Sequence, residues 1–193
     1  SRDDLYSLEK YAAVRDDFRT KVMAHKQNRR VAIGANATLY FEDSLTIQYQ
    51  VQEMLRIERI FEAAGIQEEL DAYNPLIPDG SNWKATFMLE YPDEDERREQ
   101  LCKLLGIERY IWAQVADCAR ITPIADEDLE REDEEKTSSV HFLRFELTAE
   151  MVQAVKAGAA VNMGINHPAY TEAVEPIAQD IRDALAKDLQ DTF

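Results

Sequence analysis

Three histidines are the residues of this chain with the widest range of chemistry. An imidazole can ligate a metal ion or transfer a proton near neutral pH. His141 alternates with apolar residues up to Leu147, which places it on the apolar face of a predicted strand. His167 lies in a predicted turn beside Pro168. A histidine on an apolar strand face is more often a hydrogen-bonded core residue than a ligand, so both interpretations of His141 stay open.

Carboxylates on other predicted elements could complete a site with these histidines. Glu90 ends a predicted strand, and Glu53 lies on a predicted helix, where it can pair with Arg56 three residues later. Mixed nitrogen and oxygen ligands suit a transition metal, and the same groups could act as acid and base. Nothing in their spacing requires a site. The alternative is that Glu90 is a solvated strand end and that Glu53 and Arg56 form a pair on a helix surface.

A proline-containing segment, residues 74–82, is predicted to be a loop that lines a ligand pocket. Polar loops on a rigid scaffold often bind ligands. The candidate pocket residues are Arg56, Asn74, Asp79, Asn82 and Trp83. The alternative is a structural loop that its two prolines hold in place.

Common catalytic and cofactor motifs are missing from the sequence. It has no Gly-rich phosphate loop, no Gly-x-Ser-x-Gly elbow and no His-Glu-x-x-His pair, so whether the protein is an enzyme stays open. Cys102 and Cys118 are too few and too far apart for a disulfide framework or a zinc ribbon. Both are predicted to be small buried hydrophobic residues.

The formal net charge of −16 at pH 7 restricts the classes of partner. A field of this sign repels nucleic acid and anionic lipid, which leaves a basic protein, a cation or a small polar ligand. The alternative is that the charge only maintains solubility. One basic cluster ends the first predicted helix, where it would complement the helix dipole or bind an anion. The cluster consists of Lys21, His25, Lys26, Arg29 and Arg30, with His25 predicted to be exposed.

No secretory or membrane segment is visible in the sequence. No apolar stretch reaches the roughly 18 residues that a membrane span needs, and the first residues contain no apolar signal region. We therefore expect a soluble cytoplasmic protein.

Hydrophobic periodicity predicts a single α+β domain over residues 1–193, with a mainly helical part at 1–74 and a sheet-containing part at 83–193. The sheet should be mainly antiparallel, with helices on one face. Predicted helices span residues 3–30, 44–65, 66–73, 93–105, 148–157 and 177–189. Predicted strands span residues 31–34, 38–41, 83–91, 110–117, 120–125, 139–147, 159–165 and 170–175. The charged run 126–136 is predicted to be a solvated loop or helical turn.

Several long stretches resemble a known family, among them RDDLYSLEKY from Arg2, TLYFEDSLTIQYQVQEMLRIERI from Thr38, ELDAYNPLIPDGSNWKATFMLEY from Glu69 and MGINHPAY from Met163. This is the uncharacterised bacterial family catalogued as domain of unknown function 3501. The resemblance covers nearly the whole chain and implies a bacterial cytoplasmic protein with no assigned reaction. Relatives tend to be encoded near rubrerythrin-like and iron–sulfur proteins, which implies a redox or oxidative-stress setting by association alone.

Three hypotheses about function follow. The first is a binding or accessory protein that serves a basic or redox partner through electrostatic attraction. The second is a metal- or cofactor-dependent enzyme that uses His141, His167, Glu90 and Glu53. The third is a structural homo-oligomer, for which a homodimer is the simplest form.

Overall fold

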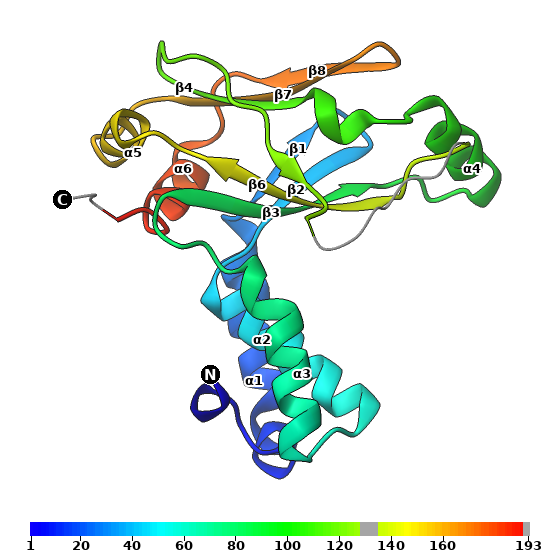
Figure 1. The fold of residues 1–193 in the computed structure, drawn as a ribbon, viewed down its shortest axis with the longest axis vertical. Coiled ribbons are helices and arrows are strands. Elements are labelled where there is room, and N and C mark those ends of the chain that lie inside the picture. The colour runs from blue at the N-terminus through cyan, green and yellow to red at the C-terminus, as the bar shows by residue number, and fades with distance from the viewer. Residues whose placement is uncertain (128–134, 191–193) are drawn as a thin grey trace.

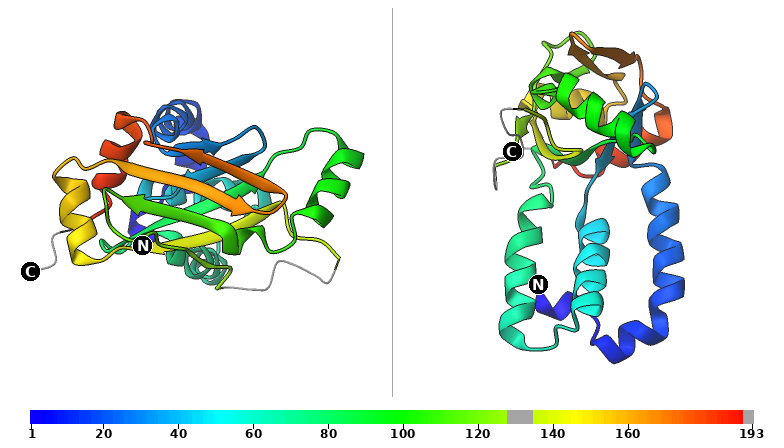
Figure 2. Two further views of the ribbon diagram at one scale, coloured as in Figure 1. Left: turned by 90° about the horizontal axis from the view of Figure 1, so that it is seen from above. Right: turned by 90° about the vertical axis from the view of Figure 1, so that its right-hand side faces the viewer.

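Two antiparallel β-sheets pack face to face, and a stalk of three helices projects from the outer side of the larger sheet (Figure 1). The computed structural model describes residues 1–127 and 135–190. Figure 2 shows the stalk extending well away from the sheets, with the N-terminus lying along it. The predicted α+β class is confirmed, although the single predicted sheet is in fact two.

The stalk consists of α1 (Leu8–Gln27), α2 (Ser44–Glu58) and α3 (Ala63–Tyr73). A 3-10 turn, η1 (Arg2–Asp4), precedes α1, so the first helix begins later than predicted. The Asp43 side chain accepts hydrogen bonds from the first free N–H groups of α2. The predicted helix end at Gly65 is wrong because α2 ends at Glu58 and is followed by Arg59, whose φ is 56°. The chain reverses there, which lets Ile60 pack beside the small apolar cluster of α2 and α3.

The larger sheet has five strands in the order β1-β2-β3-β6-β5, all antiparallel. These are β1 (Arg30–Ile33), β2 (Ala37–Phe41), β3 (Asn82–Leu89), β6 (Val140–Glu146) and β5 (Ile124–Ala125). Side chains alternate between the two faces of each strand. The register therefore sets Tyr40, Thr86 and Phe142 in one row across the outer face.

The smaller sheet has the order β4-β7-β8, with β4 (Ile111–Val115), β7 (Val161–His167) and β8 (Tyr170–Val174). The predicted strand at 120–125 is shorter than expected because its two ends pair with different sheets. Ile121 bridges to Ala113 of β4, whereas Ile124 pairs with Arg144 of β6. Pro123, between them, has no N–H to donate to a continuous ladder.

Short helices complete the chain around the sheets: η2 (Asn74–Leu76), α4 (Glu94–Lys103), η3 (Ile107–Tyr110), α5 (Ala149–Lys156) and α6 (Gln179–Ala186). The Thr148 side chain caps α5 as predicted. The prediction that Cys102 is buried is wrong. This cysteine is exposed, because α4 buries none of its residues. Cys118 is half-buried. Most of the predicted charged loop, residues 128–134, lies outside the described residues.

A continuous apolar core fills the space between the two sheets. Its largest fully buried side chains include Trp83, Phe87 and Phe145 from the larger sheet and Met163 and Ile165 from the smaller one. The other face of the larger sheet is half-buried and meets the stalk. No helix in the described part of the chain is long and apolar enough to cross a membrane.

Candidate functional site

The two sequence-predicted histidines make separate structural contacts. His141 lies fully buried on the core face of β6, as predicted, with Nδ1 2.5 Å from Asp126 Oδ2 and Nε2 2.8 Å from Thr137 Oγ1. It thereby joins the two ends of the segment between β5 and β6. His167 accepts a hydrogen bond from the Ala169 N–H and contacts the Leu105 carbonyl. These two contacts indicate that His167 shapes the β7–β8 turn.

The two candidate carboxylates also have hydrogen-bond partners of their own. Glu53 forms the predicted pair with Arg56 and accepts a hydrogen bond from the Tyr11 hydroxyl. It also accepts hydrogen bonds from Nε and Nη2 of Arg15, each at 2.8 Å. The hydrogen bonds from Arg15 lower the pKa of Glu53 to about 2. Glu90 accepts hydrogen bonds from the hydroxyls of Thr38 and Tyr40. Neither carboxylate contacts a candidate histidine through these bonds.

The positions of these four candidate residues do not support a shared metal site. Within residues 1–127 and 135–190, no three His, Cys, Asp or Glu side chains form a group that could hold a metal ion. Each of the four candidate ligands uses its own set of neighbours, so the structure does not bring His141, His167, Glu90 and Glu53 into one site.

The second half of the predicted pocket loop is structural. Asp79 accepts hydrogen bonds from the N–H and hydroxyl of Ser81, and the Ser81 N–H is the main cause of its lowered pKa. Asn82 is fully buried and donates to Glu146. Trp83 is part of the core, where its indole N–H donates to the Leu185 carbonyl. Arg56 remains on the stalk with Glu53.

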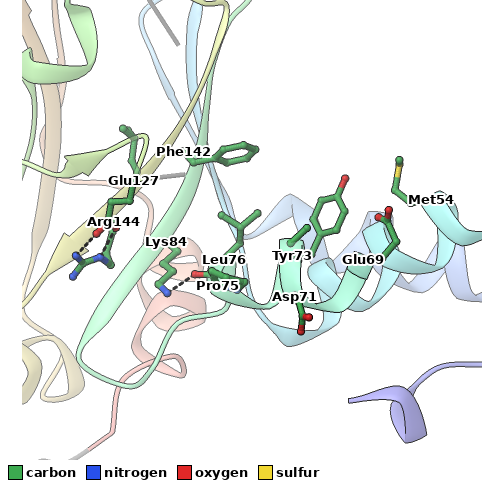
Figure 3. Close-up of a pocket in the computed structure, with 12 residues that line it drawn as sticks. Met54, Glu69, Asp71, Tyr73, Pro75, Leu76, Lys84, Glu127, Phe142 and Arg144 are labelled. Carbon is green, nitrogen blue, oxygen red and sulfur yellow. Dashed lines mark hydrogen bonds and ion pairs between the residues drawn. The ribbon is translucent and has the colours of Figure 1, made fainter. Parts of the chain in front are cut away.

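The first half of the loop borders hollows on the surface, mostly through residues other than the predicted ones. Asn74 borders a hollow on the stalk of about 460 Å³. Pro75 and Leu76 border a larger hollow of about 630 Å³ between the base of the stalk and the outer face of the five-stranded sheet (Figure 3). A neighbouring hollow of about 360 Å³ shares Tyr73, Leu76 and Phe142 with it. We call the two adjoining hollows the stalk–sheet groove.

Strand alternation and the end of α3 build the stalk–sheet groove. The core face of β3 carries Trp83 and Phe87, so Lys84 and Thr86 face outward into the groove. Phe142 extends from β6 toward Tyr73 and Leu76 on the stalk (Figure 3). The whole lining of the larger hollow is Met54, Glu69, Asp71, Ala72, Tyr73, Pro75, Leu76, Lys84, Glu127, Phe142, Leu143 and Arg144.

The cations of the groove are already engaged within the protein. The Lys84 ammonium donates to the Pro75 carbonyl at 2.5 Å, which ties the sheet to the stalk. Arg144 is paired with Glu127 and Glu146. The Lys26 ammonium, in the smaller hollow, lies 5.9 Å from the centre of the Tyr49 ring.

Two carboxylates of the groove have a different environment. Glu42 accepts hydroxyl hydrogen bonds from Thr46 at 2.5 Å and Thr86 at 2.8 Å. Glu69 is half-buried, and burial together with the nearby charges of Glu58 and Glu68 raises its pKa. As far as the described residues go, neither Glu42 nor Glu69 forms an ion pair. The groove therefore combines apolar and aromatic walls with two carboxylates that form no ion pair within the described residues.

A buried charged joint between stalk and sheets escaped the sequence analysis. Arg29, predicted only to complement the helix dipole or bind an anion, is 3% exposed and donates to Asp188 at 2.5 Å and to the Phe41 and Glu42 carbonyls. Asp43 accepts from His25 at 2.6 Å and lies 3.4 Å from Arg29. His25, predicted to be exposed, is half-buried.

Burial raises the pKa of Asp188, against the effect of Arg29. Burial acts in the same direction on Asp43, but Arg29, the Thr46 N–H and His25 outweigh it and lower the pKa of this carboxyl. No local pattern could reveal the joint, because Arg29 and Asp188 are 159 positions apart.

Taken together, these features define an α+β protein with a helical stalk and a groove at the base of that stalk. The chain belongs to the family described as protein of unknown function (DUF3501), whose model matches residues 1–189. Its fold is similar to that in a crystal structure of a novel protein of unknown function from Burkholderia pseudomallei K96243, with a TM-score of 0.93, 52% sequence identity and 98% of each chain covered. No protein of curated function matches it.

Proposed function

We propose that this protein is a binding or accessory protein whose stalk–sheet groove holds an apolar, positively charged segment of a partner protein. One observation carries the proposal: the cations that line the groove are engaged by the protein itself, whereas Glu42 and Glu69 have no ion-pair partner within the described residues. A bound cation would give these two carboxylates an ion-pair partner.

The dimensions and walls of the groove support this role. Ligand sites commonly have volumes of roughly 300–1,000 Å³ and mainly apolar walls with a few polar groups, and both hollows lie within that range. Aromatic rings such as those of Tyr73 and Phe142 favour apolar groups and, through their faces, cations. The net charge of −16 would in addition accelerate encounter with a basic surface.

The other two hypotheses have less support. The four residues proposed for a metal- or cofactor-dependent enzyme have separate partners. A homo-oligomer would bring two strongly acidic chains together. The redox setting implied by the family resemblance stays a prediction.

A short fluorescein-labelled peptide of leucine and lysine, titrated at low salt with anisotropy as the readout, tests the proposal. We expect it to bind and a leucine–glutamate peptide not to bind. Glu69→Lys should weaken binding about tenfold, because it places a positive charge at the groove. Glu68→Lys changes the net charge equally on an exposed neighbouring residue outside the groove and should weaken binding only slightly. Equal losses in the two variants would mean that general attraction, and not the groove, binds the peptide.

A further inference from the structure

The smaller hollow of the groove is lined by one carboxylate, that of Glu42, and by the aromatic rings of Tyr40, Tyr73 and Phe142. Thr86 lies between Tyr40 and Phe142 in the cross-strand row, and its hydroxyl donates to Glu42. Tyr40 and Phe142 therefore flank the position where Glu42 meets the sheet, and Tyr73 borders the same hollow from the stalk. Glu42 is half-buried and has no ion pair in the described residues.

We infer that this hollow is a subsite for an ammonium group, in particular the side chain of a lysine in the partner segment. The inference rests on the proposed function, because it names the chemistry that one end of the groove recognises. A carboxylate removed from bulk water attracts a cation strongly, and ring faces nearby stabilise it further. The apolar side chains of Leu76 and Met88 would contact the methylene groups of the lysine.

The hydrogen bonds of Glu42 leave acceptor positions free for a bound cation. Its Oε1 accepts from Thr86, and its Oε2 accepts from Thr46. Each carboxylate oxygen offers about two acceptor positions, so one position on each oxygen is already used. An ammonium is a compact charge that needs only one free position.

Lys26 provides a second test, in which the expected change in binding is the opposite of that for Glu42. It lines the same hollow, with its ammonium over the Tyr49 ring and not in an ion pair with Glu42. Its positive charge should oppose a bound cation. Removing that charge should therefore strengthen binding, whereas removing the charge of Glu42 should weaken it.

The experiment is an NMR titration with N-acetyl-lysine methylamide, and with the norleucine analogue as the probe that lacks the ammonium. We expect the lysine probe to bind more tightly than the norleucine analogue and to shift amide signals around Thr86. Glu42→Gln removes the charge at nearly the same shape, keeps one of the two acceptor oxygens, and should weaken binding of the lysine probe about tenfold. Lys26→Met should strengthen it severalfold.

Glu90→Gln is the matched control. Glu90 also accepts two hydroxyl hydrogen bonds at this sheet, from Thr38 and Tyr40, but does not line the hollow. It should leave the affinity for the lysine probe unchanged. Equal affinity for lysine and norleucine probes, or equal losses in Glu42→Gln and Glu90→Gln, would overturn the subsite. The proposed function would survive that result if Glu69→Lys still released the leucine–lysine peptide, and would fail with it if it did not.

Discussion

The sandwich of sheets and the helical stalk are held together in different ways. The sandwich has one continuous apolar core to which both sheets contribute. The stalk has two small apolar clusters, one around Tyr11 and Phe18 and the other around Val51 and Leu55. Three short helices enclose little apolar volume, so the stalk relies in addition on polar side-chain contacts such as those of Glu53. We therefore expect charge to matter most for the stability of the stalk and of the joint between stalk and sheets. Packing should matter most for the stability of the sandwich.

The largest expected effect is in the sandwich. Trp83→Ala removes the largest fully buried side chain and the indole hydrogen bond to Leu185. We expect the free energy of unfolding to fall by about 3–5 kcal/mol, because the cavity left behind cannot fully collapse. Urea denaturation followed by circular dichroism measures this loss. A loss below about 1 kcal/mol would mean that the core repacks and fills the cavity, contrary to this expectation.

The joint should show the next largest effect. Arg29→Met leaves two buried or half-buried carboxylates, Asp43 and Asp188, without their arginine. We expect a loss of about 3 kcal/mol, partly recovered when Asp188→Asn removes one of the two charges. Arg30→Met, at the next and exposed position, is the control and should change stability by less than about 0.5 kcal/mol. Similar values for Arg29→Met and Arg30→Met would show that the joint contributes nothing.

The stalk should respond to pH through Glu53. A carboxyl whose pKa is lowered by folding stabilises the protein above its ordinary pKa and loses that effect as the pH falls toward the folded value. For Glu53 this interval runs from 4.5 down to about 2. Glu53→Gln should lower stability by about 2 kcal/mol at neutral pH, and its difference from the parent protein should shrink across that interval. Thermal melts at several pH values test this, with the exposed Glu58→Gln as the control; a difference independent of pH would contradict it.

The smallest effect is expected at the far end of the stalk. Ile57 and Phe61 are 62% and 72% exposed, so replacing either by serine should change the free energy of unfolding by less than about 0.5 kcal/mol. Thermal melts at low and high protein concentration measure this. A large loss that grows with concentration would show that another copy of the chain covers these residues in solution.

Local chemistry allowed much of the fold to be predicted from the sequence. Two helices begin within one residue of their predicted starts, directly after Asp43 and Thr148, and the turn at His167 joins two strands as expected. The errors arose where distant packing overrides local signals. Gly65 looked like a helix end, but α2 ends at Glu58 and Gly65 lies inside α3. The exposed position of Cys102 could not be inferred, because it depends on how α4 sits against the sheets.

The sequence by itself determined the α+β class, the antiparallel pairing and the burial of His141, because periodicity and capping act between neighbouring residues. Tertiary structure alone decided which polar residues meet. Glu42, Glu69 and Phe142 come from three separate parts of the chain, and only the placement of the stalk on the sheet makes them walls of one groove. Arg29 and Asp188 likewise meet only after folding. Such contacts arise when the whole chain closes, so no short stretch of the sequence contains them.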